Sequence, residues 1–166
     1  SSYGTRVALL AADLPQVKTL MLDAAYRFED GLFSQEPLLL AQMFEFHEAL
    51  YMQWPGRVGS FASLYAKAAD RLKVQAVEFD VAHFYSGKKI AYVLTPERLV
   101  DIAFSTLYRN DMYGAFYAGL SSFVAQGKVG EEFERVVASY VDSAYDEDFS
   151  TMVFFSSECA DNQREE

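Results

Sequence analysis

The sequence predicts a mostly helical chain with one small β-hairpin, together with one further helix and two short strands of the kind that belong to a larger sheet. Apolar residues recur every three or four positions in several long segments, as they do on the buried side of an amphipathic helix. A turn that contains Gly87 separates two runs rich in strand-forming residues, which is the pattern of a hairpin. Two further apolar runs, at residues 17–23 and 152–156, are nearly continuous, as in strands covered on both faces.

Five helices are expected in the middle of the chain. The first ends before Pro55 and Gly56, because this pair breaks a helix. The third begins at Thr95 and Pro96, because a threonine hydroxyl can cap the first turn and proline is favoured at the first helical position. The helical segments are residues 37–54, 58–72, 95–107, 111–125 and 130–142, and the hairpin arms are residues 74–84 and 90–94.

The helical spacing also predicts which side chains face the core. These are Leu39, Met43, Phe46, Leu50 and Trp54 in the first helix, Phe61, Leu64, Tyr65, Ala68 and Leu72 in the second, Leu99, Ile102, Ala103, Thr106 and Leu107 in the third, and Phe133, Val136, Val137, Tyr140 and Val141 in the fifth.

The segment before these helices has a different character. Residues 6–12 predict a helix that ends at Leu14 and Pro15, and a buried strand is expected to follow over residues 17–23. A strand of this kind needs neighbours, because its unpaired edge otherwise stays exposed. We expect it to pair with residues 152–156, to pair with a second copy of the chain in a homodimer, or to rearrange.

Composition excludes several classes of function. The chain has 166 residues and a formal net charge of −10, and it lacks the basic cluster that would bind a nucleic acid. No run approaches the roughly 20 apolar residues that span a membrane. No signal peptide is evident, so a soluble acidic domain is expected, in a compartment that the sequence leaves open. One cysteine and two histidines argue against a disulfide framework and against a cysteine-rich or histidine-rich metal site. No metal or organic cofactor is implied.

The motif that carries chemistry is Ser2-Tyr3-Gly4, followed directly by a helix rich in small apolar residues. In a nucleophile elbow, a serine stands on a strained turn that leads into a helix, with small residues on either side. Ser2 would be the nucleophile and Gly4 the closing glycine. The backbone N–H of Tyr3 would help to bind the oxyanion. The alternative is that Ser2 merely caps a helix.

A family resemblance rests on the two ends of the chain. Residues 1–8 (SSYGTRVA) and 14–24 (LPQVKTLMLDA) resemble the elbow, helix and following strand of α/β-hydrolases of the proline iminopeptidase and tripeptidyl aminopeptidase type. Residues 154–161 (FFSSECAD) resemble the segment with which that family returns to its catalytic domain after a helical cap, or lid. The helix that starts at Thr95 and the break at Gly127 also resemble this cap.

The resemblance implies three parts of a serine peptidase. Residues 1–25 would be a partial α/β-hydrolase core, residues 26–148 the helical cap, and residues 149–166 the return segment to the core. The family takes its acid and histidine after the serine, in the order Ser, Asp, His, and nothing after Asp161 supplies them. The chain is therefore expected to be a fragment, inactive by itself, of an aminopeptidase-like enzyme.

The substrate implied for the whole enzyme is a short peptide, cut at its N-terminus through an acyl-enzyme. Asp161, and with less support Glu158, would bind the free ammonium group of the substrate, although both could equally belong to a solvated acidic end. Two alternatives stay open. One is an esterase-type hydrolase that acts on small esters or amides, and the other is a non-enzymatic helical binding domain whose Ser-Tyr-Gly opening is chance.

The two histidines, the cysteine and the aromatic residues are expected to have structural roles. His47 is expected to be a partly exposed helix histidine and His83 a residue on a strand face, and Cys159 is expected to pack in a core or pocket wall. Aromatic residues are expected mainly in the core, although a cap over a hydrolase site would present some of them to an apolar substrate. The aromatic residues concerned are Phe44, Tyr51, Trp54, Tyr113, Phe116 and Tyr117.

Overall fold

A computed structural model describes residues 8–9, 11–22, 32–83 and 87–144 of the chain. The chain divides into two compact units. The first comprises Ser1–Pro37 and Met152–Glu166, and the second comprises Leu38–Thr151. Within the described residues the fold is mostly helical, with five long helices and one antiparallel hairpin of two strands.

Before residue 32, the described part of the first unit has little regular structure. Residues 8, 9 and 11 are helical, and turns then follow, with the Leu14 N–H donating to the Ala11 carbonyl at 3.1 Å. The strand expected over residues 17–23 is wrong for its described part, since residues 17–22 form no strand and Met21 is 94% exposed. A two-sided buried strand requires neighbours that supply hydrogen bonds and cover both faces. Residues 152–156 lie outside the described residues, so their pairing and the homodimer stay predictions.

Helix α2 (Leu32–Tyr51) begins in the first unit and continues into the second. It starts five residues earlier than expected and contains Pro37 in its interior, and it ends before Trp54, which closes a tight turn by donating to the Tyr51 carbonyl at 3.0 Å. One predicted core residue of α2 is misplaced, because the side chain of Phe46 is 49% exposed.

Helix α3 (Phe61–Val74) matches its predicted buried side, with Phe61, Leu64, Tyr65, Ala68 and Leu72 all buried. Its N-terminus is capped twice. The Ser60 hydroxyl oxygen accepts from the Ser63 N–H at 3.2 Å, and the Glu48 carboxylate of α2 accepts from the Ala62 N–H at 3.2 Å. Since free N–H groups at a helix start need acceptors, Glu48 both caps α3 and ties α2 to it.

The expected hairpin is confirmed and consists of β1 (Val77–Ala82) and β2 (Lys89–Leu94). The register runs from Val77 opposite Leu94 to Ala82 opposite Lys89. Gly87 has a positive φ of 63°, a conformation that glycine adopts without strain. Val81, Tyr92 and Leu94 bury their side chains, so one face of the hairpin is covered.

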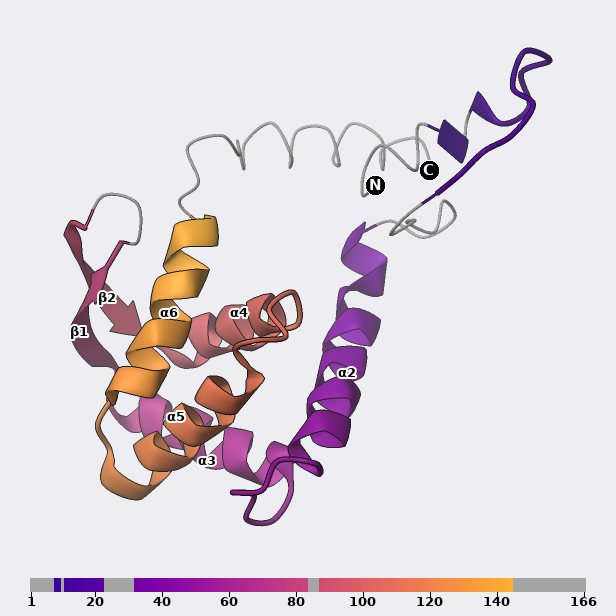
Figure 1. The fold of residues 1–166 in the computed structure, drawn as a ribbon. Coiled ribbons are helices and arrows are strands. Elements are labelled where there is room, and N and C mark those ends of the chain that lie inside the picture. Colours follow the sequence, from indigo (N-terminus) through magenta and orange to yellow (C-terminus); the bar gives the residue numbers. More distant parts are fainter. Residues whose placement is uncertain (1–7, 10, 23–31, 84–86, 145–166) are drawn as a thin grey trace. The chain divides into compact units, whose positions relative to one another are not determined.

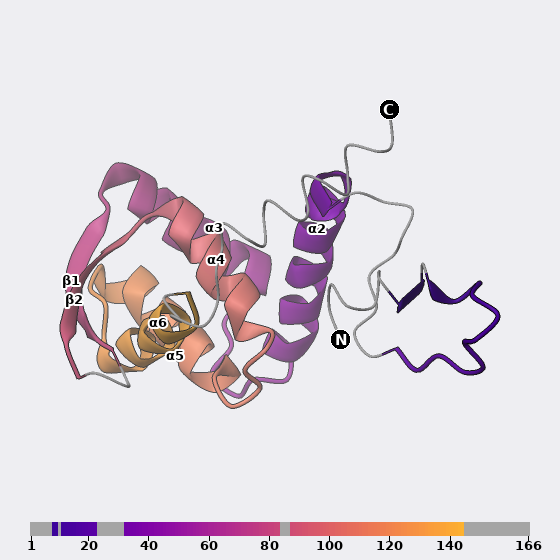
Figure 2. The same cartoon turned by 90° about the horizontal axis from the view of Figure 1, so that it is seen from above.

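Helices α4 (Pro96–Thr106), α5 (Tyr113–Gln126) and α6 (Glu131–Ala144) follow the predicted order. Thr95 caps α4 through its side chain, which accepts from the Arg98 N–H at 3.3 Å, and Gly127 ends α5 in the left-handed conformation. Figures 1 and 2 show α3 to α6 packed together with the hairpin beside them, and α6 contacts β1. None of the described helices is long and apolar enough to cross a membrane.

Candidate functional site

The residues predicted from the sequence as site residues lie outside the described residues. This applies to the nucleophile Ser2, to Tyr3, and to the candidate ammonium-binding residues Glu158 and Asp161. It also applies to Cys159. Their roles stay predictions, and the described residues show a different polar centre.

That centre is the side chain of His47 on α2, which is fully buried. Its Nε2 lies 2.9 Å from the backbone oxygen of Ala103 on α4, and its Nδ1 lies 3.0 Å from the hydroxyl of Tyr117 on α5. A carbonyl oxygen can only accept, so Nε2 carries the hydrogen and the neutral ring accepts from Tyr117 at Nδ1. The expectation of a partly exposed histidine is therefore wrong.

The burial of His47 follows from its place on the helix. Met43, His47 and Tyr51 are spaced four residues apart, so they lie on one side of α2, and all three are buried. The adjacent Phe46, which was expected to face the core, is the residue that is turned outward. The spacing alone could have placed His47 in this row, but a polar side chain is buried in a core only where hydrogen-bond partners are present.

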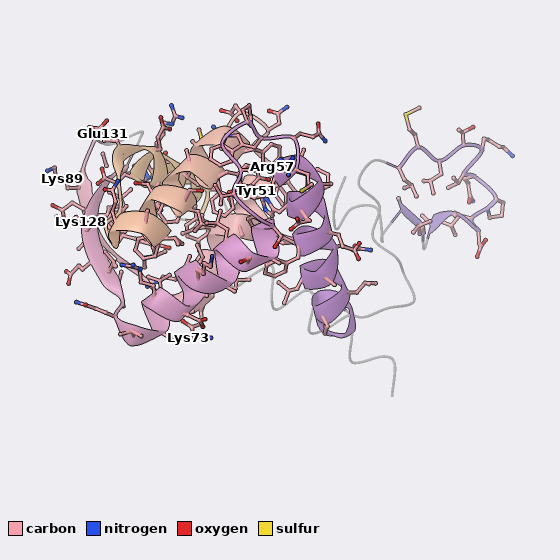
Figure 3. All side chains as sticks on the ribbon, turned by 90° about the horizontal axis from the view of Figure 1, so that it is seen from below. Tyr51, Arg57, Lys73, Lys89, Lys128 and Glu131 are labelled. Carbon is pink, nitrogen blue, oxygen red and sulfur yellow. The ribbon has the colours of Figure 1, made fainter. Side chains whose placement is uncertain are left out.

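Aromatic rings surround the imidazole on the sides that its hydrogen bonds leave open. The ring of Phe61 on α3 stacks on it with centroids 4.8 Å apart, and the rings of Phe116 and Tyr113 lie 5.4 and 6.2 Å away. Tyr51 joins the cluster through its ring, which lies 6.2 Å from that of Phe61, and its hydroxyl oxygen accepts from the Val58 N–H at 2.9 Å. Figure 3 labels Tyr51 and Arg57 where α2 leads toward α3.

Burial controls the titration of this centre. Loss of hydration lowers the pKa of His47, against a smaller opposing effect of its hydrogen bond to the Ala103 carbonyl. Burial also raises the pKa of Tyr117, with smaller contributions from Tyr113 and the Glu48 carboxylate. With both ring nitrogens engaged and the ring fully buried, His47 has no nitrogen free to accept a proton from a substrate or a nucleophile.

The second histidine belongs to a separate pair. His83, directly after β1, has its Nε2 3.6 Å from the Oδ1 of Asp142 on α6. Both side chains are largely buried, with exposed fractions of 18% and 16%. The pair joins the end of the hairpin to α6. The sequence held no signal for it, because the two residues are far apart in the chain and only the packing of α6 brings them together.

The aromatic residues considered for substrate contact are mainly core residues, as expected. Tyr51, Phe116 and Tyr117 are buried, whereas Phe44, Trp54 and Tyr113 are half-buried and pack against the core. One surface hollow, of about 720 Å³, lies elsewhere, between the end of α3, the start of β1 and the end of α5. Its lining includes Arg71, Val77 and Phe123, and none of the predicted site residues. The described residues contain no cluster of side chains suited to hold a metal ion.

Comparisons with protein-family models, with curated proteins and with solved structures find no match to this chain.

Proposed function

We propose that this chain comprises the nucleophile elbow and the helical cap of an α/β-type serine hydrolase, and that the whole enzyme is an aminopeptidase-like peptidase. The observation that carries the proposal is the motif Ser2-Tyr3-Gly4 in its context, with the family-like segments at residues 14–24 and 154–161. The helical residues 8, 9 and 11 support it, because an elbow requires a helix directly after the turn.

The organisation of the chain agrees with a cap placed between two parts of one catalytic domain. Ser1–Pro37 and Met152–Glu166 belong to one unit, and the helices and hairpin of Leu38–Thr151 form the other. An inserted cap produces this division, because its own core is separate from that of the domain into which it is inserted.

In the proposed reaction, the Ser2 hydroxyl loses its proton to a histidine and attacks the scissile carbonyl, and the Tyr3 N–H donates to the oxyanion. The acyl-enzyme is then hydrolysed by water. His47 is unsuited to be this histidine, because it is buried and both of its nitrogens are engaged. His83 is paired with Asp142, but this histidine precedes its acid in the chain, whereas the family has the order Ser, Asp, His. The 166-residue chain by itself is therefore expected to be inactive.

A fluorophosphonate probe tests the proposal on the full-length product of the gene that encodes this segment. Such probes phosphonylate an activated serine, so we expect labelling that mass spectrometry assigns to Ser2. The Ser2→Ala variant should lose the label, and the matched Ser1→Ala variant should keep it. A full-length protein that stays unlabelled, or that keeps its label in Ser2→Ala, contradicts the proposal.

A non-enzymatic binding domain is the second candidate, and one observation favours it. Helix α2 carries apolar side chains outward as well as inward, since Leu38 and Phe46 are 54% and 49% exposed, and Met52 directly after the helix is 48% exposed. An exposed apolar helix face is typical of a protein-binding surface. An unlabelled full-length protein would favour this candidate over the hydrolase.

A further inference from the structure

The side chain of His47 makes two hydrogen bonds that link α2 to α4 and α5. Its Nε2–H donates to the Ala103 carbonyl of α4, and its Nδ1 accepts from the Tyr117 hydroxyl of α5. The Tyr117 hydroxyl also lies 3.4 Å from the backbone oxygen of His47 itself. Both of these hydrogen bonds from α2 therefore depend on one imidazole, in one tautomer.

Protonation would place a charge on the buried ring, to which no carboxylate of the described residues is hydrogen-bonded. The groups that face the ring from α3, α4 and α5 are the Phe61 ring, the Ala103 carbonyl, and Tyr113 with Tyr117. The Tyr113 hydroxyl donates to the Leu107 carbonyl.

On α2 itself, the neighbouring Tyr51 hydroxyl is bonded to the Val58 backbone, and the Glu48 carboxylate is bonded to the start of α3. No described carboxylate forms a hydrogen bond with the imidazole. A buried charge that lacks a paired opposite charge is costly.

We propose that His47 is a pH-sensitive switch, which holds α2 against α3, α4 and α5 while the ring is neutral and releases α2 when the ring is protonated. In the released state the imidazolium is hydrated, and the Tyr117 hydroxyl donates to solvent. The proposal does not depend on the hydrolase assignment.

The direction of the pH effect follows from burial. Burial lowers the pKa of His47 below its ordinary 6.5, so the docked state binds a proton less readily than the released state does. Docking is therefore favoured above about pH 6.5 and weakens as the pH falls toward the lowered pKa of the docked state. Within that window, the ratio of released to docked molecules rises by up to about tenfold for each pH unit.

Release would act on the junction between the two units. Helix α2 carries the chain from Pro37, the last residue of the first unit in that part of the chain, to Leu38 of the second. Acidification would thus free α2 from α3, α4 and α5 while α3 to α6 keep their own core.

The single tryptophan makes the proposal measurable. Trp54 follows α2, and its ring centroid lies 6.0 Å from that of Tyr117 and 5.7 Å from that of Tyr51. Release of α2 separates Trp54 from Tyr117 of α5, so we expect a reversible change in Trp54 fluorescence of the 166-residue chain between pH 8 and pH 4.5, with a midpoint below 6.5. Circular dichroism should keep most of its helical signal through the transition.

Two variants identify the responsible histidine. In His47→Gln, the amide can donate to the Ala103 carbonyl but does not titrate, so the fluorescence transition should disappear. His83→Gln is the matched control, because it removes the other histidine of the chain, and it should keep the transition. An unchanged midpoint and amplitude in His47→Gln overturns the proposal. So does the absence of any fluorescence transition in the wild type, or a loss of all helical signal at the same midpoint.

A measurement on the unmodified chain serves if His47→Gln does not fold. The imidazole proton resonances of the two histidines are assigned with the His83→Gln variant and followed against pH. We expect the His47 midpoint to coincide with that of Trp54. A His47 resonance that titrates at 6.5 or above, or at a pH different from the Trp54 transition, overturns the proposal.

Discussion

Gly119 of α5 lies against the backbone of Phe133 at the start of α6. A Cβ atom at position 119 would lie 2.6 Å from the Phe133 Cβ and 2.9 Å from its Cα and backbone nitrogen. Phe133 is fully buried, and its ring lies 6.4 Å from that of Phe123 and 6.2 Å from that of Phe116. Because Gly119 has no side chain, α5 and α6 can approach each other closely at this point.

The Gly119→Ala variant should be destabilised, because the added methyl group meets backbone atoms that cannot turn aside. Overpacking of a core typically costs about 1–3 kcal/mol, which should exceed the gain of about 1 kcal/mol in helix propensity. Urea unfolding followed by circular dichroism measures the change. Gly114→Ala in the same helix is the matched control, since nothing lies within 4 Å of its Cβ position, and this variant should be stabilised. Equal effects in the two variants would contradict the close packing.

The hydroxyl of Tyr65 is buried and has no hydrogen-bond partner among the described residues. An unsatisfied buried hydroxyl costs about 1–3 kcal/mol, so Tyr65→Phe should raise the free energy of unfolding. Tyr51→Phe is the comparison, because its hydroxyl accepts from the Val58 N–H, and that variant should be less stable than the wild type. Denaturant midpoints of both variants test the opposite signs. A destabilised Tyr65→Phe would show that its hydroxyl has a partner.

Removal of the Tyr117 hydroxyl should affect both stability and titration. Tyr117→Phe leaves the Nδ1 of His47 without its donor, which should cost about 1–2 kcal/mol at pH 8. In the wild type, the hydrogen bond from the Tyr117 hydroxyl to Nδ1 stabilises the neutral ring. The variant lacks this stabilisation, so the pKa of His47 should rise. Proton resonances of His47 followed against pH measure this shift. An unchanged or lower pKa would argue against the tautomer with hydrogen on Nε2.

The cap of α4 offers a prediction at the protein surface. Thr95→Ala removes the oxygen that accepts from the Arg98 N–H and should lower the free energy of unfolding by about 1 kcal/mol. Thr95→Ser keeps the oxygen and should retain most of the wild-type stability. Thermal unfolding of the two variants compares them directly. If both lose the same stability, the methyl group of Thr95 matters rather than the cap.

The proposed ammonium site predicts a selective effect in the full-length enzyme. Asp161→Asn should raise KM for peptides with a free N-terminus by roughly 10- to 150-fold, since hydrogen bonds to charged groups contribute about 1.5–3 kcal/mol. Hydrolysis of an N-acetylated ester should not change. Glu158→Gln is the matched variant and should have the smaller effect. Equal losses on both substrates would indicate that Asp161 supports the fold rather than binding the amine.

Local features of the sequence were sufficient for the elements whose stability is local. The apolar spacing of α3 and α6 identified their buried sides correctly, because residues three or four positions apart lie on the same side of a helix. Thr95 identified the start of α4 correctly, because a capping residue lies next to its helix in the chain. Gly87 helped to identify the hairpin for the same reason, since the connection between two antiparallel strands depends on its own residues.

Other features were decided only by the tertiary structure. Residues 17–22 have the composition of a strand but form none, because a strand depends on partners elsewhere. His47 has a polar side chain, yet it is buried because Ala103 and Tyr117 form hydrogen bonds with its two ring nitrogens. Gly119 and the pair of His83 with Asp142 likewise gain their roles from segments distant in the chain. The sequence alone thus determined helices, caps and the turn, whereas the packing of one helix on another decided which polar groups could be buried.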